Sequence, residues 1–162
     1  MQTKEIAVKM VLSGWKNGQD KIEKALAMLS DDDMDMELMP DGNSVSWVVG
    51  HLAAVNDSLL TILGLGEKLN EDYFDYFLND DSPVKVPTVA QTRDYWRVTI
   101  ERLNDAMAEL SAEDWFDKHT TVSAEDFAKE PHRNRLNVLL SRTYHLNHHY
   151  GQLALVLKTI TV

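Results

Sequence analysis

The fold follows from one stretch of the chain, NRLNVLLSRTYHLNHHYGQLALVLKTI, which covers residues 134–160. Seven residues recur every three or four positions, which places them on one face of an α-helix. We call this mainly apolar, core-facing stripe the seam. Its residues are Leu139, Thr143, Leu146, Tyr150, Leu153, Leu157 and Ile160. Three of the six histidines lie in the same stretch. The stretch therefore predicts one long helix, from about Asn134 to Ile160, that carries both an apolar face and a histidine cluster.

Three further segments repeat the helical spacing, and none shows the alternation of a strand. They run from about Glu5 to Leu29, from Ser44 to Leu63 and from Thr88 to Leu110. Asn43 or Ser44 can cap the second segment, and Thr88 can cap the third. Each seam has about two apolar positions per heptad, as a four-helix bundle requires. We therefore predict an all-α four-helix bundle that forms a single domain over residues 1–162.

The links between these segments are long enough to be crossovers, so short up-and-down loops are not implied. They cover Ser30 to Asn43, Leu65 to Pro87 and Ser111 to Arg133. The second link contains four aromatic residues at Tyr73, Phe74, Tyr76 and Phe77. This cluster predicts a short helix that either covers the bundle or packs against a second subunit.

The composition excludes several classes of protein. With 16 Lys and Arg against 26 Asp and Glu, the formal charge is −10, which disfavours binding to nucleic acid or to an anionic membrane. The chain has no cysteine, which rules out disulfides, thiolate metal ligands and a cysteine nucleophile. Met1 to Gly14 lack a basic stretch followed by an unbroken apolar one, so we expect a soluble cytoplasmic protein.

The histidines of the last segment are spaced for metal binding. His145 and His149 are four residues apart, so they project from one helix face on successive turns, at the flank of the seam. His148 points nearly opposite the seam, and we assign it to the surface or to a subunit contact. His119 and His132 lie in the polar third link, where we expect them to be exposed.

His51 lies at the matching flank of the second segment, one position before the seam residue Leu52. Imidazole nitrogen is a good ligand for zinc, nickel, copper and iron. Three histidines leave an open position on the metal ion, which suits catalysis better than a structural role. We therefore predict a divalent metal site at His51, His145 and His149. The competing interpretation is that these histidines satisfy core polar groups or form an interface.

Other side chains can contribute to such a site. Gln152 follows the histidine pair by about one turn on the same face, where it can bond a ligand or the substrate, or merely fill a polar position. Trp15, Trp47 and Trp96 can wall a pocket or simply belong to the core.

Two motifs together resemble a known family. They are Ser44-Val-Ser-Trp-Val-Val-Gly-His51-Leu-Ala and His145-x-x-x-His149-x-Gly151-Gln152-Leu153. Their combination is similar to the DinB/YfiT-like family of metal-dependent enzymes, and the resemblance spans almost the whole chain. It implies a bundle of up-down-down-up topology, a homodimer, and zinc or nickel bound at His51, His145 and His149. This chain departs from the pattern at Tyr150, where family members commonly carry Arg.

The resemblance also implies two kinds of reaction. Some relatives are transferases that use low-molecular-weight thiols such as bacillithiol or mycothiol, and others are described as hydrolases. We predict a metal-dependent enzyme with a small-molecule substrate, either a thiol-dependent S-transferase or a hydrolase, in which thiol or water occupies the open position. The alternative is a non-catalytic, metal-binding or stress-related bundle that acts as a dimeric interaction protein.

Overall fold

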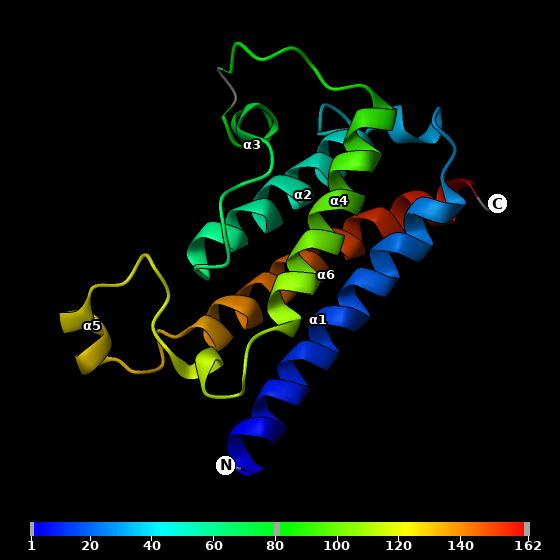
Figure 1. Ribbon diagram of the computed structural model, residues 1–162. Coiled ribbons are helices and arrows are strands. Elements are labelled where there is room, and N and C mark those ends of the chain that lie inside the picture. The colour runs from blue at the N-terminus through cyan, green and yellow to red at the C-terminus, as the bar shows by residue number, and fades with distance from the viewer. Residues whose placement is uncertain (1, 80–81, 161–162) are drawn as a thin grey trace.

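The computed structural model describes residues 2–79 and 82–160, and this part of the chain is helical without any strand. Four helices are long: α1 (Gln2–Met28), α2 (Val45–Ile62), α4 (Val89–Ala108) and α6 (Arg135–Ile160). Two are short, α3 (Glu71–Leu78) and α5 (Ala124–Lys129), and two are single 3₁₀ turns, η1 (Asp33–Asp35) and η2 (Asp114–Phe116). Figure 1 shows the long helices packed together, with α3 and α5 at the periphery. The all-α prediction is confirmed.

The starts of α2 and α4 are set by the predicted capping residues. The Ser44 hydroxyl accepts a hydrogen bond from the backbone N–H of Trp47 at 3.2 Å. Thr88 forms a reciprocal capping box with Gln91, whose side-chain oxygen accepts from the Thr88 N–H at 2.9 Å. Each cap satisfies backbone donors that the first helical turn leaves free. Local sequence therefore determines where these two helices begin.

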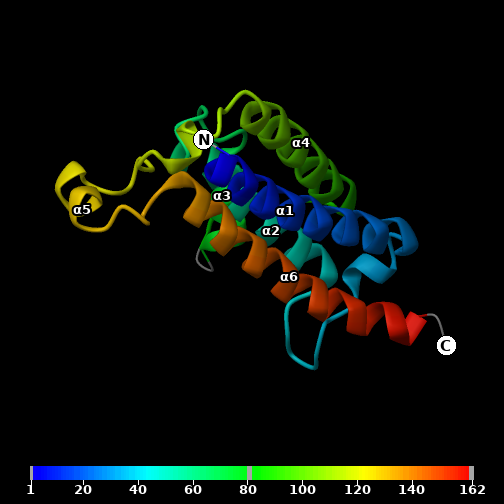
Figure 2. The same cartoon turned by 90° about the horizontal axis from the view of Figure 1, so that it is seen from below.

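The long helices pack in two main pairs, α1 with α6 and α2 with α4, while α2 also reaches α6. Figure 2 shows α1 and α6 lying side by side along their length. Gln19, the polar interruption in the α1 seam, is buried and exchanges two amide hydrogen bonds of 3.1 Å with Asn104 of α4. A buried amide is tolerated because its donors and acceptors are paired, so this contact ties α1 to α4.

The link between α1 and α2 and the link between α4 and α6 have the same local structure. Ser30 donates its N–H and its hydroxyl to Asp33, the first residue of η1, and Ser111 does the same to Asp114, the first residue of η2. Each link then forms one isolated antiparallel bridge just before the next long helix, Glu37 with Ser44 and Lys118 with Asn134. Helix α5 lies within the second of these links and was not predicted, because it spans six residues and buries none of them.

Helix α3 covers α2 within the same chain, which confirms the predicted short helix. The carboxylate of Asp57 on α2 is fully buried and accepts hydrogen bonds from the backbone N–H groups of Leu69 and Asn70 and from the Tyr95 hydroxyl. Asn70 in turn caps α3. A buried carboxylate requires such partners. Asp57 therefore holds the residues just before α3 against α2.

Helix α2 is the most apolar element. Over Val45–Ile62 its mean hydropathy is 1.2, and by length and composition it resembles a membrane-spanning helix. However, 67% of this window is buried inside the protein, as expected for a core helix.

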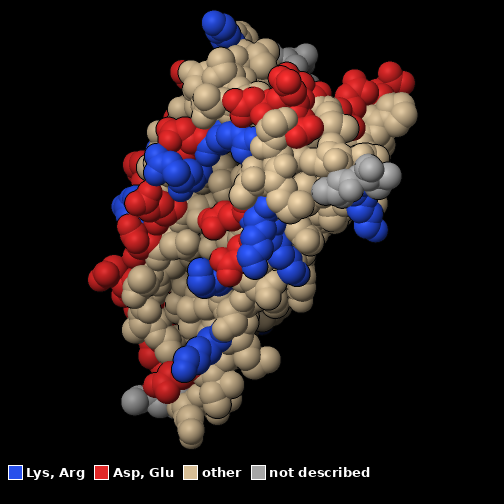
Figure 3. All heavy atoms as spheres, turned by 90° about the vertical axis from the view of Figure 1, so that its right-hand side faces the viewer, with Lys and Arg blue, Asp and Glu red and all other residues tan. Residues whose placement is uncertain are grey.

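The charged side chains lie mainly on the surface. On the face shown in Figure 3, Lys and Arg lie among Asp and Glu instead of forming one continuous basic area.

The contact between Gly50 and Phe77 makes α3 sensitive to a single methyl group. A Cβ atom added at Gly50 would lie 2.0 Å from the Phe77 ring, so we expect Gly50→Ala to displace α3 and destabilise the fold by about 1–3 kcal/mol. The matched control is Gly151→Ala in α6, where an added Cβ meets nothing within 4 Å and should stabilise by about 0.5–1 kcal/mol. Urea unfolding followed by circular dichroism measures both. Wild-type stability in Gly50→Ala would show that the Phe77 contact does not hold α3.

Candidate metal centre

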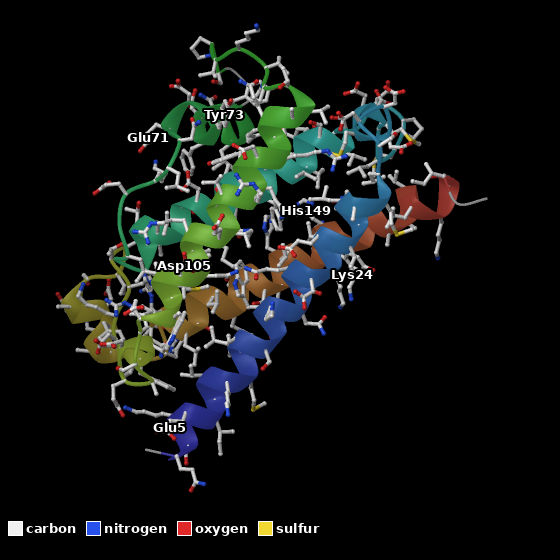
Figure 4. All side chains as sticks on the ribbon, turned by 45° about the vertical axis from the view of Figure 1, so that its right-hand side comes forward. Glu5, Lys24, Glu71, Tyr73, Asp105 and His149 are labelled. Atoms are coloured by element: carbon white, nitrogen blue, oxygen red, sulfur yellow. The ribbon has the colours of Figure 1, made fainter. Side chains whose placement is uncertain are left out.

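Three histidines from two helices converge on one point. The Nε2 atom of His145 lies 3.3 Å from Nε2 of His51 and 3.1 Å from Nε2 of His149. One ligand atom from each of the three residues lies within 4.8 Å of the others. Figure 4 shows His149 near the centre of the molecule, between the long helices. The pair on α6 and the single histidine on α2 are thus brought together by the packing of these two helices.

The opposite ring nitrogens are held by neighbouring acceptors. The Nδ1 atom of His51 lies 3.2 Å from the backbone carbonyl oxygen of Phe77, and Nδ1 of His149 lies 2.6 Å from Oε1 of Gln152. Both rings therefore donate from Nδ1, which leaves a lone pair on each Nε2. Trp47 stacks on the His51 ring, with 5.0 Å between ring centroids and 9° between planes. These contacts orient two of the three imidazoles.

Hydrogen bonds among the three rings cannot satisfy this arrangement. His145 carries at most one proton on Nε2 when neutral, so it can donate to His51 or to His149 but not to both. At least one of the two close contacts is then left without a hydrogen bond. A cation bound to all three Nε2 atoms would satisfy both contacts. With zinc–nitrogen bonds of about 2.0–2.1 Å in tetrahedral geometry, ligand nitrogens are about 3.3 Å apart, which fits the separations found here.

The rings are also poised in the neutral form that a metal ion needs. Burial lowers the pKa of His51, His145 and His149 below the usual histidine value. The effect is largest for His145, whose pKa is lowered to about 4 by burial and by the neighbouring His149, His51 and Arg142. Neutral imidazole is the ligand form, so the cluster is ready to bind a metal at neutral pH.

The remaining histidines and the tryptophans do not all follow the predictions. His148 and His132 are exposed, as expected. His119 was predicted to be exposed but is half-buried, because its link folds back against the end of α2. Trp15 and Trp96 belong to the hydrophobic core, whereas Trp47 contacts the histidine cluster.

Sequence reasoning missed two contributors to this region. The first is Phe77, which acts through its backbone carbonyl, so its side chain gives no signal of the role. The second is Arg142, which lies three residues before His145 and is half-buried, with no hydrogen-bond partner found for its Nε atom among the described residues. The spacing of three, which places Arg142 and His145 on one helix face, was the available signal.

Comparison with known protein families agrees with the all-helical fold. The family model of the DinB superfamily matches residues 15–153, a span that contains His51, His145, His149 and Gln152. A search of curated proteins found no match. With this match over most of its length, the chain belongs to the DinB superfamily.

Proposed function

We propose that the protein is a metal-dependent enzyme in which His51, His145 and His149 bind one divalent transition metal ion, zinc or nickel. The observation that carries the proposal is the convergence of the three Nε2 atoms, with Nδ1 of His51 and of His149 already committed to Phe77 and Gln152. Without a bound ion, at least one of the two close contacts of His145 Nε2 has no hydrogen bond.

The surrounding residues define what such a site can do. A bound divalent ion lowers the pKa of a coordinated water or thiol and polarises a carbonyl group. The Phe77 carbonyl and the Gln152 amide fix the tautomer and the orientation of two ligand rings, as outer partners of metal-binding histidines do. Three protein ligands leave room for a small molecule. The chain has no cysteine, so a thiol would come from a low-molecular-weight cofactor. The proposed reactions are thiol-dependent S-transfer and hydrolysis.

The fold proposal is a four-helix bundle of up-down-down-up order in one domain. It is supported by the pairing of α1 with α6 and of α2 with α4. The colour gradient in Figure 1 also supports it, because it runs one way along α1 and α6 and the opposite way along α2 and α4. We further propose a homodimer, supported by the exposed side chains of Tyr144, His148 and Leu155 on one face of α6. The cytoplasmic location stays a prediction.

Metal content tests the ligand set directly. Untagged wild-type protein should contain about one equivalent of zinc or nickel by plasma mass spectrometry, and His51→Ala should contain almost none, because two ligands on one helix bind weakly. His148→Ala is the matched control on α6, since this exposed ring lies outside the cluster, and it should keep the metal. Full metal content in His51→Ala with unchanged helicity would rule out the shared site.

The Gln152 contact tests whether the outer partners matter. Gln152→Ala removes the acceptor at His149 Nδ1 and should weaken zinc binding by about 10–100-fold, measured by competition with a chromophoric chelator. Asn147→Ala is the control, because the Asn147 amide bonds the Thr143 carbonyl and Lys21 instead of the cluster. Equal affinity in the two variants would mean that Gln152 does not position His149.

Turnover decides whether the site is catalytic. Metal-loaded protein should transfer a small thiol to a reactive electrophile or hydrolyse an activated ester. Chelation should abolish this activity and restored metal should recover it, because His51, His145 and His149 act only through the ion. His51→Ala should be inactive under the same conditions, and His148→Ala should be active. A metal-loaded protein without turnover in either assay would instead indicate a non-catalytic bundle.

A further inference from the structure

A pocket of about 300 Å³ lies between the end of α2 and the first half of α6. It is lined by Ile62 of α2, by His119 and Thr121 of the link before α5, and by Asn137, Ser141 and Arg142 of α6. None of the described residues that line it is acidic. In a chain whose formal charge is −10, this absence makes the pocket a locally positive place.

Arg142 is the charged group of this pocket, and no counterion pairs with it in the part of the chain that the structure describes. Its guanidinium is half-buried, its Nε atom is buried without a hydrogen-bond partner, and no ion pair to it is found among the described residues. By contrast, Arg93, Arg97 and Arg133 each pair with a carboxylate. A partly desolvated cation without a partner is unfavourable, and burial accordingly lowers the pKa of Arg142. An anion in the pocket would supply the missing partner.

Among the pocket-lining residues on α6, Arg142 lies nearest in sequence to His145. Arg142 precedes His145 by three residues, so the two side chains lie on the same face of α6, about 4.5 Å apart along the helix axis. His51 and Ile62 are eleven residues apart on α2, which again places them on one face about three turns apart. The positive charge of Arg142 acts on both His51 and His145 and lowers the pKa of each.

The chemistry of the lining favours an oxyanion. A guanidinium presents donors in a planar fork that matches a carboxylate or a phosphate with two parallel hydrogen bonds. The Asn137 amide and the Ser141 hydroxyl lie around the same pocket and supply further donors, while the Thr121 hydroxyl already pairs with Nδ1 of His119. An apolar or cationic ligand would leave the guanidinium half-buried and unpaired.

We propose that Arg142 and the polar side chains of this pocket bind the anionic group, a carboxylate or a phosphate, of the small molecule that reacts at the histidine cluster. The reaction at the cluster rests on the proposed function, but the anion pocket itself requires no metal. The proposal thus assigns a substrate class, small anions, and names Arg142 as the residue that selects it.

The first test uses metal-free protein, titrated with sodium acetate or with sodium phosphate at constant ionic strength set by sodium chloride. Nuclear magnetic resonance should show saturable shifts of the Arg142 Nε–H signal and of the backbone amides of Asn137 and Ser141. Arg142→Gln should weaken binding by about tenfold or more, and Arg142→Lys should retain part of the affinity. Arg97→Gln on the exposed face of α4 is the charge-matched control and should bind like wild type.

This titration decides whether the pocket binds an anion through Arg142. Saturation by acetate, by phosphate or by both identifies the anion that the pocket prefers. An absence of saturation with either anion, or equal affinity in Arg142→Gln and Arg97→Gln, would overturn the proposal.

The second test asks whether the pocket serves the metal centre. In cobalt-loaded protein, 3-mercaptopropionate should bind about tenfold more tightly than 1-propanethiol, measured by the thiolate-to-cobalt absorption band, and Arg142→Gln should remove this preference. Equal binding of the two thiols by wild type would separate the pocket from the metal centre and overturn that part of the proposal. If the protein binds no cobalt, the proposed function fails, while the metal-free titration still decides the anion pocket.

Discussion

The close approach of three imidazole nitrogens is the interaction on which the organisation of this protein depends. The Nε2 atoms of His51, His145 and His149 come within 3.1 and 3.3 Å of their neighbours, although helices α2 and α6 otherwise belong to different main pairs. At most one of these two contacts can contain a hydrogen bond when the rings are neutral. The surrounding fold must therefore hold the three rings together, and its other features supply that constraint.

Part of this constraint comes from a segment distant in sequence. The buried carboxylate of Asp57 holds the backbone of Leu69 and Asn70, and Asn70 caps α3. Helix α3 then places the Phe77 carbonyl against Nδ1 of His51. The absence of a side chain at Gly50 makes this close approach possible. A chain of contacts thus runs from a core carboxylate to a candidate metal ligand and couples the stability of α3 to the geometry of the site.

The pocket lined by Arg142 differs in charge from the protein as a whole. The chain is strongly acidic, yet the pocket lined by Arg142 has no acidic lining residue among those described. The net charge around Arg142 and the histidines would be positive if a divalent ion were bound, because the imidazoles are neutral and the guanidinium is unpaired. A negatively charged small molecule balances that charge, whereas the acidic outer surface gives no such attraction. Metal binding and substrate choice would then share one physical origin, the local excess of positive charge.

The sequence by itself determined the local features of this protein. The helical period predicted the four long helices, and side-chain chemistry predicted the cap at Thr88 and a cap of α2 at Asn43 or Ser44, because both depend only on residues within one or two turns. The same period predicted that His145 and His149 share a face. The short helix α5 escaped prediction because it buries nothing, so no apolar pattern marks it.

Only the tertiary structure decided how these features combine. Three features depend on how segments distant in sequence pack: the distance between His51 and the α6 pair, the half-burial of His119, and the absence of a counterion to Arg142 among the described residues. The role of Phe77 depends on its backbone carbonyl, which every residue possesses. Spacing within a helix is set by covalent geometry and hydrogen bonds a few residues apart, whereas the contents of a cleft between helices are set by packing.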